Sequence, residues 1–390
     1  MNSDKFGKKI RGVNLGGWLL LEKWMTPSLF KGLQATDETR WCLELGKEEA
    51  TKQLKKHWES FITEEDFKWL SQVGINAVRI PVAFWLFGPP YPDHKIYEGK
   101  EPFVEGGDKY LDRAFEWAKK YGIYIVLDLH AAPGCQNGFD NGGMQGVIDW
   151  HTKEEYIQFS LEFLEKLAKR YGQHPNLIGI ETLNEPHGYK IPNPLDILKS
   201  YNREAYKRIR KHCDKHEVAV IFHDAFLPHT NYRGDFQEPE YTNVIYDTHC
   251  YQVFGEHYKN WDIYGHIQEA AINRKNQVDK IITELNLWVC VGEWSLGFPP
   301  PIDPNRPVVD PNIFSIWNQQ GPNGYVRQDM DEFQKNVAYR AYGAAQLASF
   351  ERCLSWFFWS YKIEETETEA RASWSFRDCV ERGWLPDKYN

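Results

Sequence analysis

Residues 109–130 read KYLDRAFEWAKKYGIYIVLDLH, and this stretch contains the unit that decides the fold. Its first part, Lys109–Tyr121, has the apolar spacing of an amphipathic helix. Gly122 is the kind of residue that commonly follows a helix in a left-handed conformation. Ile123–His130 is a short apolar run that ends in polar residues. The stretch therefore predicts a helix followed by a buried strand.

The same alternation recurs along the chain, which offers eight candidate strands. They are Gly12–Asn14, Ala77–Pro81, Ile123–His130, Ile178–Asn184, Val218–His223, Val244–His249, Trp288–Glu293 and Leu354–Ser360. Helical patterns lie between them at Thr63–Val73, Lys109–Tyr121, Lys153–Tyr171, Pro194–His212, Ile263–Leu287 and Met330–Arg352. Strands that alternate with helices form a parallel sheet, and eight such units predict an α/β fold of the (β/α)8, or TIM barrel, type. A doubly wound sheet is the alternative, but no strand is followed by a GxGxxG turn.

Local signals support this division of the chain. Thr63–Asp66 is a capping-box pattern that predicts a helix start, and Gly74 marks the expected end of that helix. Two long irregular segments, Phe87–Gly107 and Gly297–Asn323, predict extended loops after the second and seventh strands. Residues 1–390 are expected to form one barrel domain, since barrels of about 250 residues or more are often single domains.

The composition limits the possible partners. Hydrophobic residues are 42% and charged residues 26% of the chain, which is ordinary for a folded protein. The net charge of −9 argues against nucleic acid as a ligand. No apolar run approaches the ~18 residues of a membrane helix, so no membrane partner is expected. Aromatic residues reach 15%, which fits either ordinary core packing or a site that stacks against the apolar faces of sugars.

The seven cysteines are scattered and form no CxxC pair, so they indicate neither a zinc site nor a disulfide framework. Free thiols fit a reducing compartment. The N-terminal residues contain no apolar core of a signal peptide. We expect a cytoplasmic protein, or a secreted one if a leader has been removed, and a monomer in either case.

Polar residues follow the predicted strands at their carboxyl ends. Barrel active sites lie at that end, so these side chains are expected to converge on one mouth. A single carboxylate after a strand is often only a helix cap, but six such strand ends are hard to explain in that way. The residues are Arg79, Asp128, His130, Asn184, Glu185, His249, Tyr251, Glu293, Trp359 and Ser360.

Glu185 and Glu293 follow strands four and seven, so their side chains can face each other across the mouth. Paired carboxyl groups hydrolyse glycosides with retention at a separation of about 5–5.5 Å and with inversion at about 6.5–9.5 Å. Arg79 can keep one carboxylate ionised, and Asn184 can donate a hydrogen bond to a sugar 2-hydroxyl. His249 and Tyr251 can orient or tune the acid and the nucleophile, respectively, and Trp359 can form a flat floor for a sugar ring.

Three other readings of the same residues stay open. His130, His249, Glu185 and Glu293 can in principle form a carboxylate–histidine metal centre, although the clustered HxH and the bridging lysine of metal-dependent barrel hydrolases are missing. A sugar-binding barrel without catalysis is a second alternative. A serine hydrolase is the weakest, since the chain has no GxSxG.

At these residues the sequence strongly resembles glycoside hydrolase family 5. The matching motifs are Arg79 in Arg-Ile-Pro, Asp-Leu-His at 128–130, Asn-Glu-Pro at 184–186, His-Cys-Tyr at 249–251 and Gly-Glu-Trp at 292–294. The resemblance implies a retaining mechanism without a metal or organic cofactor, in which Glu185 is the acid/base and Glu293 the nucleophile. It implies a supporting set of Arg79, His130, Asn184, His249, Tyr251 and Trp359.

Within that family the chain resembles the exo-β-1,3-glucanases of fungi, in GVNLGGWL at 12–19, QNGFDN at 136–141 and YQVF at 251–254. The resemblance implies that Glu22, Asp140 and Asn141 hold the terminal glucose and that Phe139 and Phe254 clamp the next sugar. The expected substrate is a β-1,3-gluco-oligosaccharide cut from its non-reducing end. An endo-β-1,4-glucanase and a glucosidase of aryl, lipid or phosphorylated glucosides remain alternatives.

Overall fold

The computed structural model describes residues 5–255, 257–258, 261–298 and 331–389. Eight parallel strands form a closed barrel in chain order, and β8 pairs with β1 to close it. The strands are β1 Ile10–Asn14, β2 Ala77–Ala83, β3 Tyr124–Ala131, β4 Leu177–Glu181, β5 Ala219–His223, β6 Val244–Cys250, β7 Trp288–Trp294 and β8 Ser355–Phe358. The predicted (β/α)8 barrel is confirmed and the doubly wound alternative is wrong.

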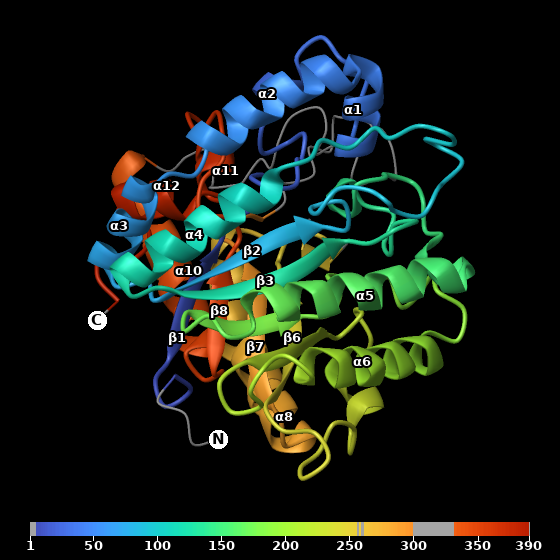
Figure 1. Cartoon of the computed structure of the whole chain (residues 1–390). Helices are drawn as coiled ribbons and strands as arrows, with labels where there is room; N and C mark the ends of the chain where they lie inside the picture. Colours follow the sequence, from blue (N-terminus) through green and yellow to red (C-terminus); the bar gives the residue numbers. More distant parts are fainter. Residues whose placement is uncertain (1–4, 256, 259–260, 299–330, 390) are drawn as a thin grey trace.

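Helices lie around the outside of the barrel (Figure 1). The α-helices are α1 Glu38–Leu45, α2 Lys47–Ser60, α3 Glu64–Val73, α4 Gly107–Tyr121, α5 Glu154–Tyr171, α6 Pro194–Arg210, α7 Ile263–Gln268, α8 Lys275–Leu285, α10 Glu332–Phe350, α11 Glu369–Ala372 and α12 Phe376–Glu381. Short 3-10 helices lie at η1 Pro27–Phe30, η2 Asp140–Gly142, η3 Trp150–Thr152 and η4 His229–Tyr232, and a π-helix at η6 Glu269–Arg274.

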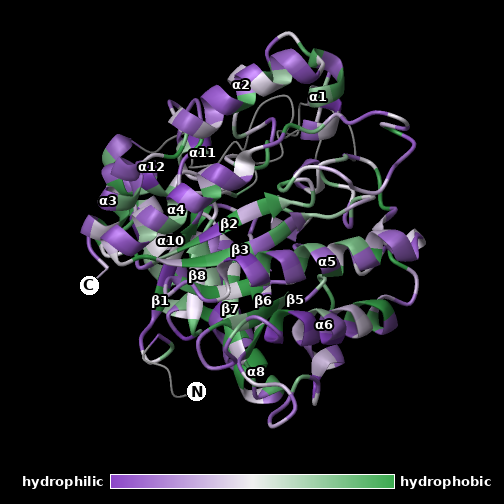
Figure 2. Ribbon diagram, in the orientation of Figure 1, coloured by the Kyte–Doolittle hydropathy of each residue, from purple (hydrophilic) through white to green (hydrophobic). Residues whose placement is uncertain are grey.

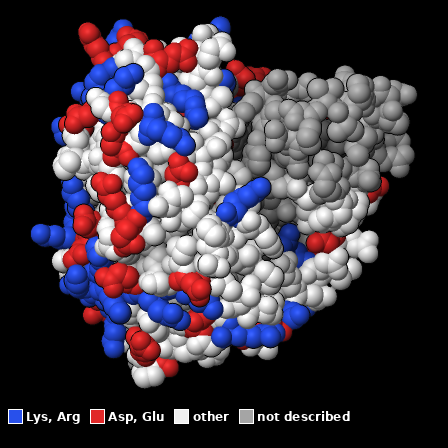
Figure 3. Space-filling view, turned by 90° about the vertical axis from the view of Figure 1, so that its right-hand side faces the viewer, with Lys and Arg blue, Asp and Glu red and all other residues white. Residues whose placement is uncertain are grey.

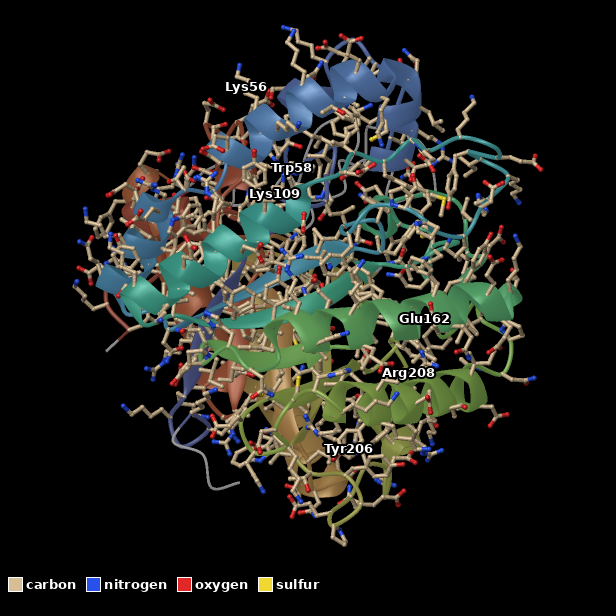
Figure 4. All side chains as sticks on the ribbon, viewed as in Figure 1. Lys56, Trp58, Lys109, Glu162, Tyr206 and Arg208 are labelled. Carbon is tan, nitrogen blue, oxygen red and sulfur yellow. The ribbon has the colours of Figure 1, made fainter. Side chains whose placement is uncertain are left out.

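The covering helices are amphipathic, which is why the apolar colour of Figure 2 concentrates on the strands and on the sides of helices that face them. Figure 4 labels residues from both sides of these helices. Trp58 on α2 and Tyr206 on α6 are buried, whereas Lys56, Lys109 and Glu162 are exposed. This pattern places the main apolar core between the barrel and its helices.

The predicted helix ends agree with the structure at α3 and α4. The backbone N–H of Thr63 donates to Asp66 Oδ2 at 2.7 Å, as expected for a capping box. Gly74 and Gly122 follow the two helices with φ of 88° and 68°, in the left-handed region. The charged helix α2 was not predicted, because its sequence buries only four side chains and leaves a weak apolar stripe.

Two predicted elements differ from the structure. The helix expected at Ile263–Leu287 consists of α7, η6 and α8, because an extra residue in one π-helical turn hardly changes the apolar spacing. The strand expected at Ile178–Asn184 ends at Glu181, where its pairing with β3 and β5 also ends. The chain then turns, and Glu185 has a positive φ of 44°. Asn184 and Glu185 therefore project from a turn rather than from the strand.

The interior of the barrel changes from apolar to charged along the strands. Side chains that point inward alternate with a period of two. On β2, β3 and β6, the inward apolar residues Ala77, Val126 and Ile245 belong to one buried cluster. Two positions further on, the same strands carry Arg79, Asp128 and Asp247, all buried. The buried apolar cluster therefore lies beneath a layer of charged residues, which in turn lies just below the carboxyl ends of the strands.

Close approach at the barrel seam requires a glycine. Gly12 on β1 lies beside Phe357 on β8, and a Cβ at Gly12 would lie only 2.2 Å from that ring.

Of the two long loops predicted from the sequence, the structure describes the first in full and only the start of the second. Residues 84–106, between β2 and α4, contain no helix or strand, as predicted, and Phe103 stacks on Trp85 at 4.0 Å. The predicted loop Gly297–Asn323 lies, beyond residue 298, outside the described residues. No described helix has the length and apolar character needed to cross a bilayer.

Candidate active site

Arg79 lies at the centre of the charged layer and is 1% exposed. Its Nε donates to Glu181 Oε2 at 2.7 Å, its Nη2 lies 3.0 Å from Asp128 Oδ2, and its Nη1 lies 3.1 Å from Glu293 Oε1. It also donates to the side-chain oxygens of Asn14 and Asn184. One guanidinium thus contacts three buried carboxyl groups and fixes two amide side chains.

The two predicted glutamates face a common histidine. His249 Nδ1 lies 2.6 Å from Glu185 Oε1 and 3.4 Å from Glu293 Oε2. Because both oxygens lie so close to one nitrogen, these two oxygens can be no more than about 6 Å apart, which is compatible with the retaining geometry. The register of the barrel explains the arrangement, since His249 on β6 pairs with Glu293 on β7 after a local shift.

The surroundings of the two carboxyl groups differ. Tyr251 donates its O–H to Glu293 Oε2 at 2.7 Å, and the same carboxylate contacts Arg79. Burial raises the pKa of Glu293 to about 7, and the charge of Glu185 adds to this increase. Burial acts to raise the pKa of Glu185, but the hydrogen bond and the charge of His249, with smaller effects of His130 and Asn141, together place that pKa below its ordinary value.

His249 is the positive partner of this pair. Burial alone would lower the pKa of His249, but the carboxylates of Glu293 and Asp247 raise it well above the ordinary value. Asp247 Oδ2 lies 3.3 Å from His249 Nε2. A proton is therefore held on or beside Nδ1 of His249, in the hydrogen bond to Glu185.

Asn184 is oriented by its neighbours. Its Oδ1 accepts from Arg79 at 2.8 Å, so its amide nitrogen must face the other way. That nitrogen lies 3.5 Å from Nε2 of His130, whose Nδ1 bonds Asp128 at 2.6 Å. The His130 ring stacks on Trp359 at 5.4 Å with nearly parallel planes. Asn184 thus has a second N–H left for a ligand, directly beside Glu185.

A pocket of about 350 Å³ opens over these groups. Its lining residues are Glu22, Trp24, Phe139, Asp140, Asn141, Gln145, Glu185, His187, Phe226, His249, Tyr251, Phe254, Glu293, Trp359 and Trp374. All six residues expected from the sequence to bind substrate are among them: Glu22, Phe139, Asp140, Asn141, Phe254 and Trp359. Arg79, His130 and Asn184 lie beneath the pocket and hold its floor.

One wall of the pocket is acidic. Glu22 accepts from the indole N–H of Trp24 at 2.8 Å, and Asn141 donates to Glu185 Oε2 at 3.4 Å. Burial, and the charges of Asp140 and the two site glutamates, raise the pKa of Glu22 well above its ordinary value. Burial likewise raises the pKa of Asp140 to about 7. Carboxyl groups that carry a proton can donate as well as accept, which suits a row of sugar hydroxyls.

Gln136 holds the pocket wall to the floor. Its side-chain oxygen accepts from the backbone of Ala132 at 3.1 Å, and its amide nitrogen donates to the carbonyls of His130 at 2.7 Å and Asn184 at 2.8 Å. Its own carbonyl accepts from the N–H of His187. Two of these four hydrogen bonds, to Asn184 and from His187, therefore join the loop after β3 to the turn after β4 through one buried residue.

Several residues of the site were not found from the sequence. His223 is the last residue of β5, and Phe226 lies three residues after it. Both residues could have been found from the end of this strand, which was not considered among the candidate site positions. Glu181 precedes the Asn-Glu-Pro triplet, and His187 follows it. Trp24 and Trp374 gave no signal, since they reach the pocket from irregular segments far apart in the chain.

The proposed four-residue metal centre is not the grouping that the structure forms. Among the described residues, two groups bring ligand atoms close enough to share an ion: Glu185 with His223 and His249, and Glu181 with Asp247 and His249. Both depend on His249, whose two ring nitrogens already face carboxylates of Glu185 and Asp247. The contacts around His249 suit a protonated imidazolium better than a metal ligand, which must be neutral.

Replacing Arg79 by methionine should lower the free energy of unfolding by about 3–5 kcal/mol, because it leaves buried carboxylates without their counter-charge. Denaturant unfolding followed by circular dichroism measures this loss. The matched control is Arg233→Met, since the Arg233 side chain is 51% exposed in its pair with Glu284 and should contribute about 1 kcal/mol or less. Equal effects of the two changes would contradict the role of Arg79 in the charged layer.

Comparison with known proteins gives a consistent set of relatives. The profile of the family "Cellulase (glycosyl hydrolase family 5)" matches residues 42–298. A glucan 1,3-beta-glucosidase of Blumeria graminis is 34% identical over 98% of this chain and 88% of its own length. A probable glucan 1,3-beta-glucosidase A of Emericella nidulans is 37% identical over 97% of this chain and 90% of its own. Among solved structures, the rutinosidase from Aspergillus niger has a TM-score of 0.76 at 19% identity, covering 98% of this chain and 99% of that one, which supports the fold.

Proposed function

Because this chain belongs to the cellulase family, glycosyl hydrolase family 5, and is thus a retaining glycoside hydrolase, we propose that it is an exo-β-1,3-glucanase that releases glucose from the non-reducing end. The names of its relatives support the choice of linkage. The substrate is then a β-1,3-gluco-oligosaccharide or a small β-glucoside.

The observation that carries the proposal is the single pocket in which the acidic wall, the paired glutamates and the aromatic rim meet. Glu22, Asp140 and Asn141 can hold the hydroxyls of one terminal glucose. Phe139 and Phe254 lie on the same lining, where they can contact the next sugar by stacking. A pocket that encloses one end of the substrate favours exo action, whereas an endo enzyme needs an open groove.

In the proposed first step, Glu293 attacks the anomeric carbon and Glu185 protonates the departing oxygen. Tyr251 and Arg79 hold the nucleophile in place from two sides. In the second step Glu185 takes a proton from water, which attacks the same carbon and releases glucose with its β-configuration retained. The free N–H of Asn184 is placed to bond the sugar 2-hydroxyl, where contact strengthens in the transition state.

The pKa order of the two glutamates in the structure is the reverse of the order that these roles require, because His249 holds the proton and Glu185 is ionised. The roles of Glu185 as the acid and Glu293 as the nucleophile are therefore assigned from the positions of the two residues and not from their pKa values. When a sugar displaces water, the loss of hydration disfavours the charged pair and favours a neutral His249 beside a protonated Glu185. The 2.6 Å hydrogen bond between them provides the path for that proton.

Product analysis over time tests the proposal. The wild-type protein is incubated with laminari-oligosaccharides and, in parallel, with cello-oligosaccharides, and the products are followed by chromatography and proton NMR. We expect early release of β-glucose alone from the β-1,3 series. Mixed shorter oligomers, mainly from the β-1,4 series, would contradict exo action and favour the endoglucanase alternative. Turnover limited to aryl or lipid glucosides would contradict the β-1,3-glucan substrate.

The partners and the location belong to the same proposal. All seven cysteines are free and buried, which supports a reducing, cytoplasmic location. On the described part of the face in Figure 3, positive and negative side chains are interspersed, an arrangement that offers no basic stripe for a nucleic acid.

A further inference from the structure

His187 lies two residues after Glu185 and lines the pocket. Its backbone is held on both sides. The N–H donates to the carbonyl of Gln136 at 3.1 Å, and the carbonyl accepts from the N–H groups of Lys190 and Ile191 at 2.8 and 3.1 Å. The turn that places Glu185 therefore also fixes the position of the His187 ring.

The ring of His187 packs against two phenylalanines, and the three rings form a triangle. Its centroid lies 5.8 Å from that of Phe139 and 6.1 Å from that of Phe226, and the two phenylalanines lie 6.4 Å apart. Phe226 in turn contacts His223 at 5.2 Å, and His223 contacts His249. A continuous set of ring contacts thus leads from His249, the buried partner of Glu185, through His223 and Phe226 to His187 and Phe139 on the pocket lining.

The two nitrogens of His187 are not equivalent. Nδ1 is buried and has no hydrogen-bond partner among the described residues. Nε2 is not among the buried unpartnered atoms, and no hydrogen bond joins it to another described side chain or backbone group. Nε2 is therefore the more exposed of the two ring nitrogens, on a side chain that lines the pocket.

The ring is neutral under ordinary conditions. Burial lowers the pKa of His187, and Lys190 lowers it further, against a smaller opposite effect of Glu185. A neutral imidazole offers one donor and one acceptor, a combination that matches a hydroxyl group better than it matches a charged ligand. Next to two apolar rings, this single polar atom can discriminate between a hydroxylated ligand and an apolar one.

We propose that His187 is a specificity-determining residue for the leaving group, in which Nε2 forms a hydrogen bond with a hydroxyl of the departing sugar. This inference rests on the proposed function, since the departing group must lie on the Glu185 side of the cleaved bond, where His187 stands. The enzyme then prefers a hydroxylated leaving group, such as a sugar, over an apolar aglycone bound against the same rings.

Three variants of His187 distinguish the effect of losing its hydrogen bond from the effect of losing its packing. His187→Leu keeps an apolar side chain against the two phenylalanines but removes both nitrogens. His187→Gln restores a polar group near the position of Nε2, whereas His187→Asn places one near Nδ1. His216→Leu is the matched control, because His216 is an exposed histidine in the segment between α6 and β5. For each variant, kcat/KM is measured on laminaribiose, laminaritriose and 4-nitrophenyl β-glucoside.

We expect His187→Leu to lose about five- to tenfold in kcat/KM on the laminari-oligosaccharides, the effect of one lost hydrogen bond, and about twofold or less on the nitrophenyl glucoside. His187→Gln should recover most of the loss, and His187→Asn should not. An equal loss on all three substrates, or no loss on either oligosaccharide, would overturn the role of His187. A wild-type protein that cleaves the nitrophenyl glucoside but neither oligosaccharide would instead contradict the proposed function, and with it the sugar leaving group.

Discussion

Replacing Glu293 by alanine should lower kcat on a β-glucoside by about 10⁴-fold or more, because no other group can form the covalent glycosyl intermediate. The Glu293 carboxylate is the one that Tyr251 and Arg79 hold from two sides, at 2.7 and 3.1 Å. Neither of these residues can replace it, since both are hydrogen-bond donors at this site. Steady-state assays with 2,4-dinitrophenyl β-glucoside measure the loss, because this substrate leaves without protonation.

Azide distinguishes a missing nucleophile from a misfolded protein. In Glu293→Ala, azide can occupy the space that the carboxylate leaves and attack the anomeric carbon from the same face. The product should then be α-glucosyl azide, identified by NMR, with partial recovery of turnover. Glu65→Ala is the matched control, since the Glu65 side chain is 75% exposed on α3, and it should keep full activity. Recovery of β-glucosyl azide from Glu293→Ala would contradict the assignment.

Replacing Glu185 by glutamine should lower kcat/KM on laminaribiose by about 10³-fold, the usual contribution of a general acid. On 2,4-dinitrophenyl β-glucoside the loss in kcat/KM should be about tenfold or less, because dinitrophenolate needs no proton to leave. The second step lacks its base, so a burst of dinitrophenol should precede slow turnover in stopped-flow assays. Equal losses on the two substrates would argue against Glu185 as the acid.

The same variant should change the pH profile in a known direction. Glu293 must be ionised to attack, so kcat/KM falls as the pH falls through its pKa in the free enzyme. The charge of Glu185 raises that pKa, and glutamine removes the charge. The acid limb measured on the dinitrophenyl substrate should therefore move to lower pH in Glu185→Gln. An unchanged or raised limb would show that the two carboxyl groups do not interact.

The alternation of strands and helices predicted the barrel because each apolar strand ends in polar residues at a regular interval. The same regularity predicted which side chains meet, since parallel strands bring their carboxyl ends to one mouth. The sequence could not predict that Asn184 and Glu185 lie beyond β4, because the left-handed turn at Glu185 uses a residue that gives no such signal.

Contacts between distant segments of the chain could also not be predicted from the sequence. Trp24 and Trp374 pack edge to face at 5.6 Å beside the pocket, although about the whole length of the barrel separates them along the chain. Arg79 was expected to pair with one carboxylate, but it contacts three, because β3, β4 and β7 each contribute an acid to one layer. Pairings of this kind depend on barrel closure and have no counterpart in local patterns.

Gln136 completes the pocket wall before a sugar arrives. Its hydrogen bonds already join the loop after β3 to the turn that carries Asn184. A wall that is ordered in the empty protein loses little conformational entropy on binding. A rigid inhibitor shaped like the flattened, positively charged sugar of the transition state then keeps nearly all of its contact energy as affinity, whereas a relaxed chair must distort to gain the same contacts. The selectivity of an inhibitor should therefore depend on how well its shape matches this pocket wall, and not on whether it can order a loop.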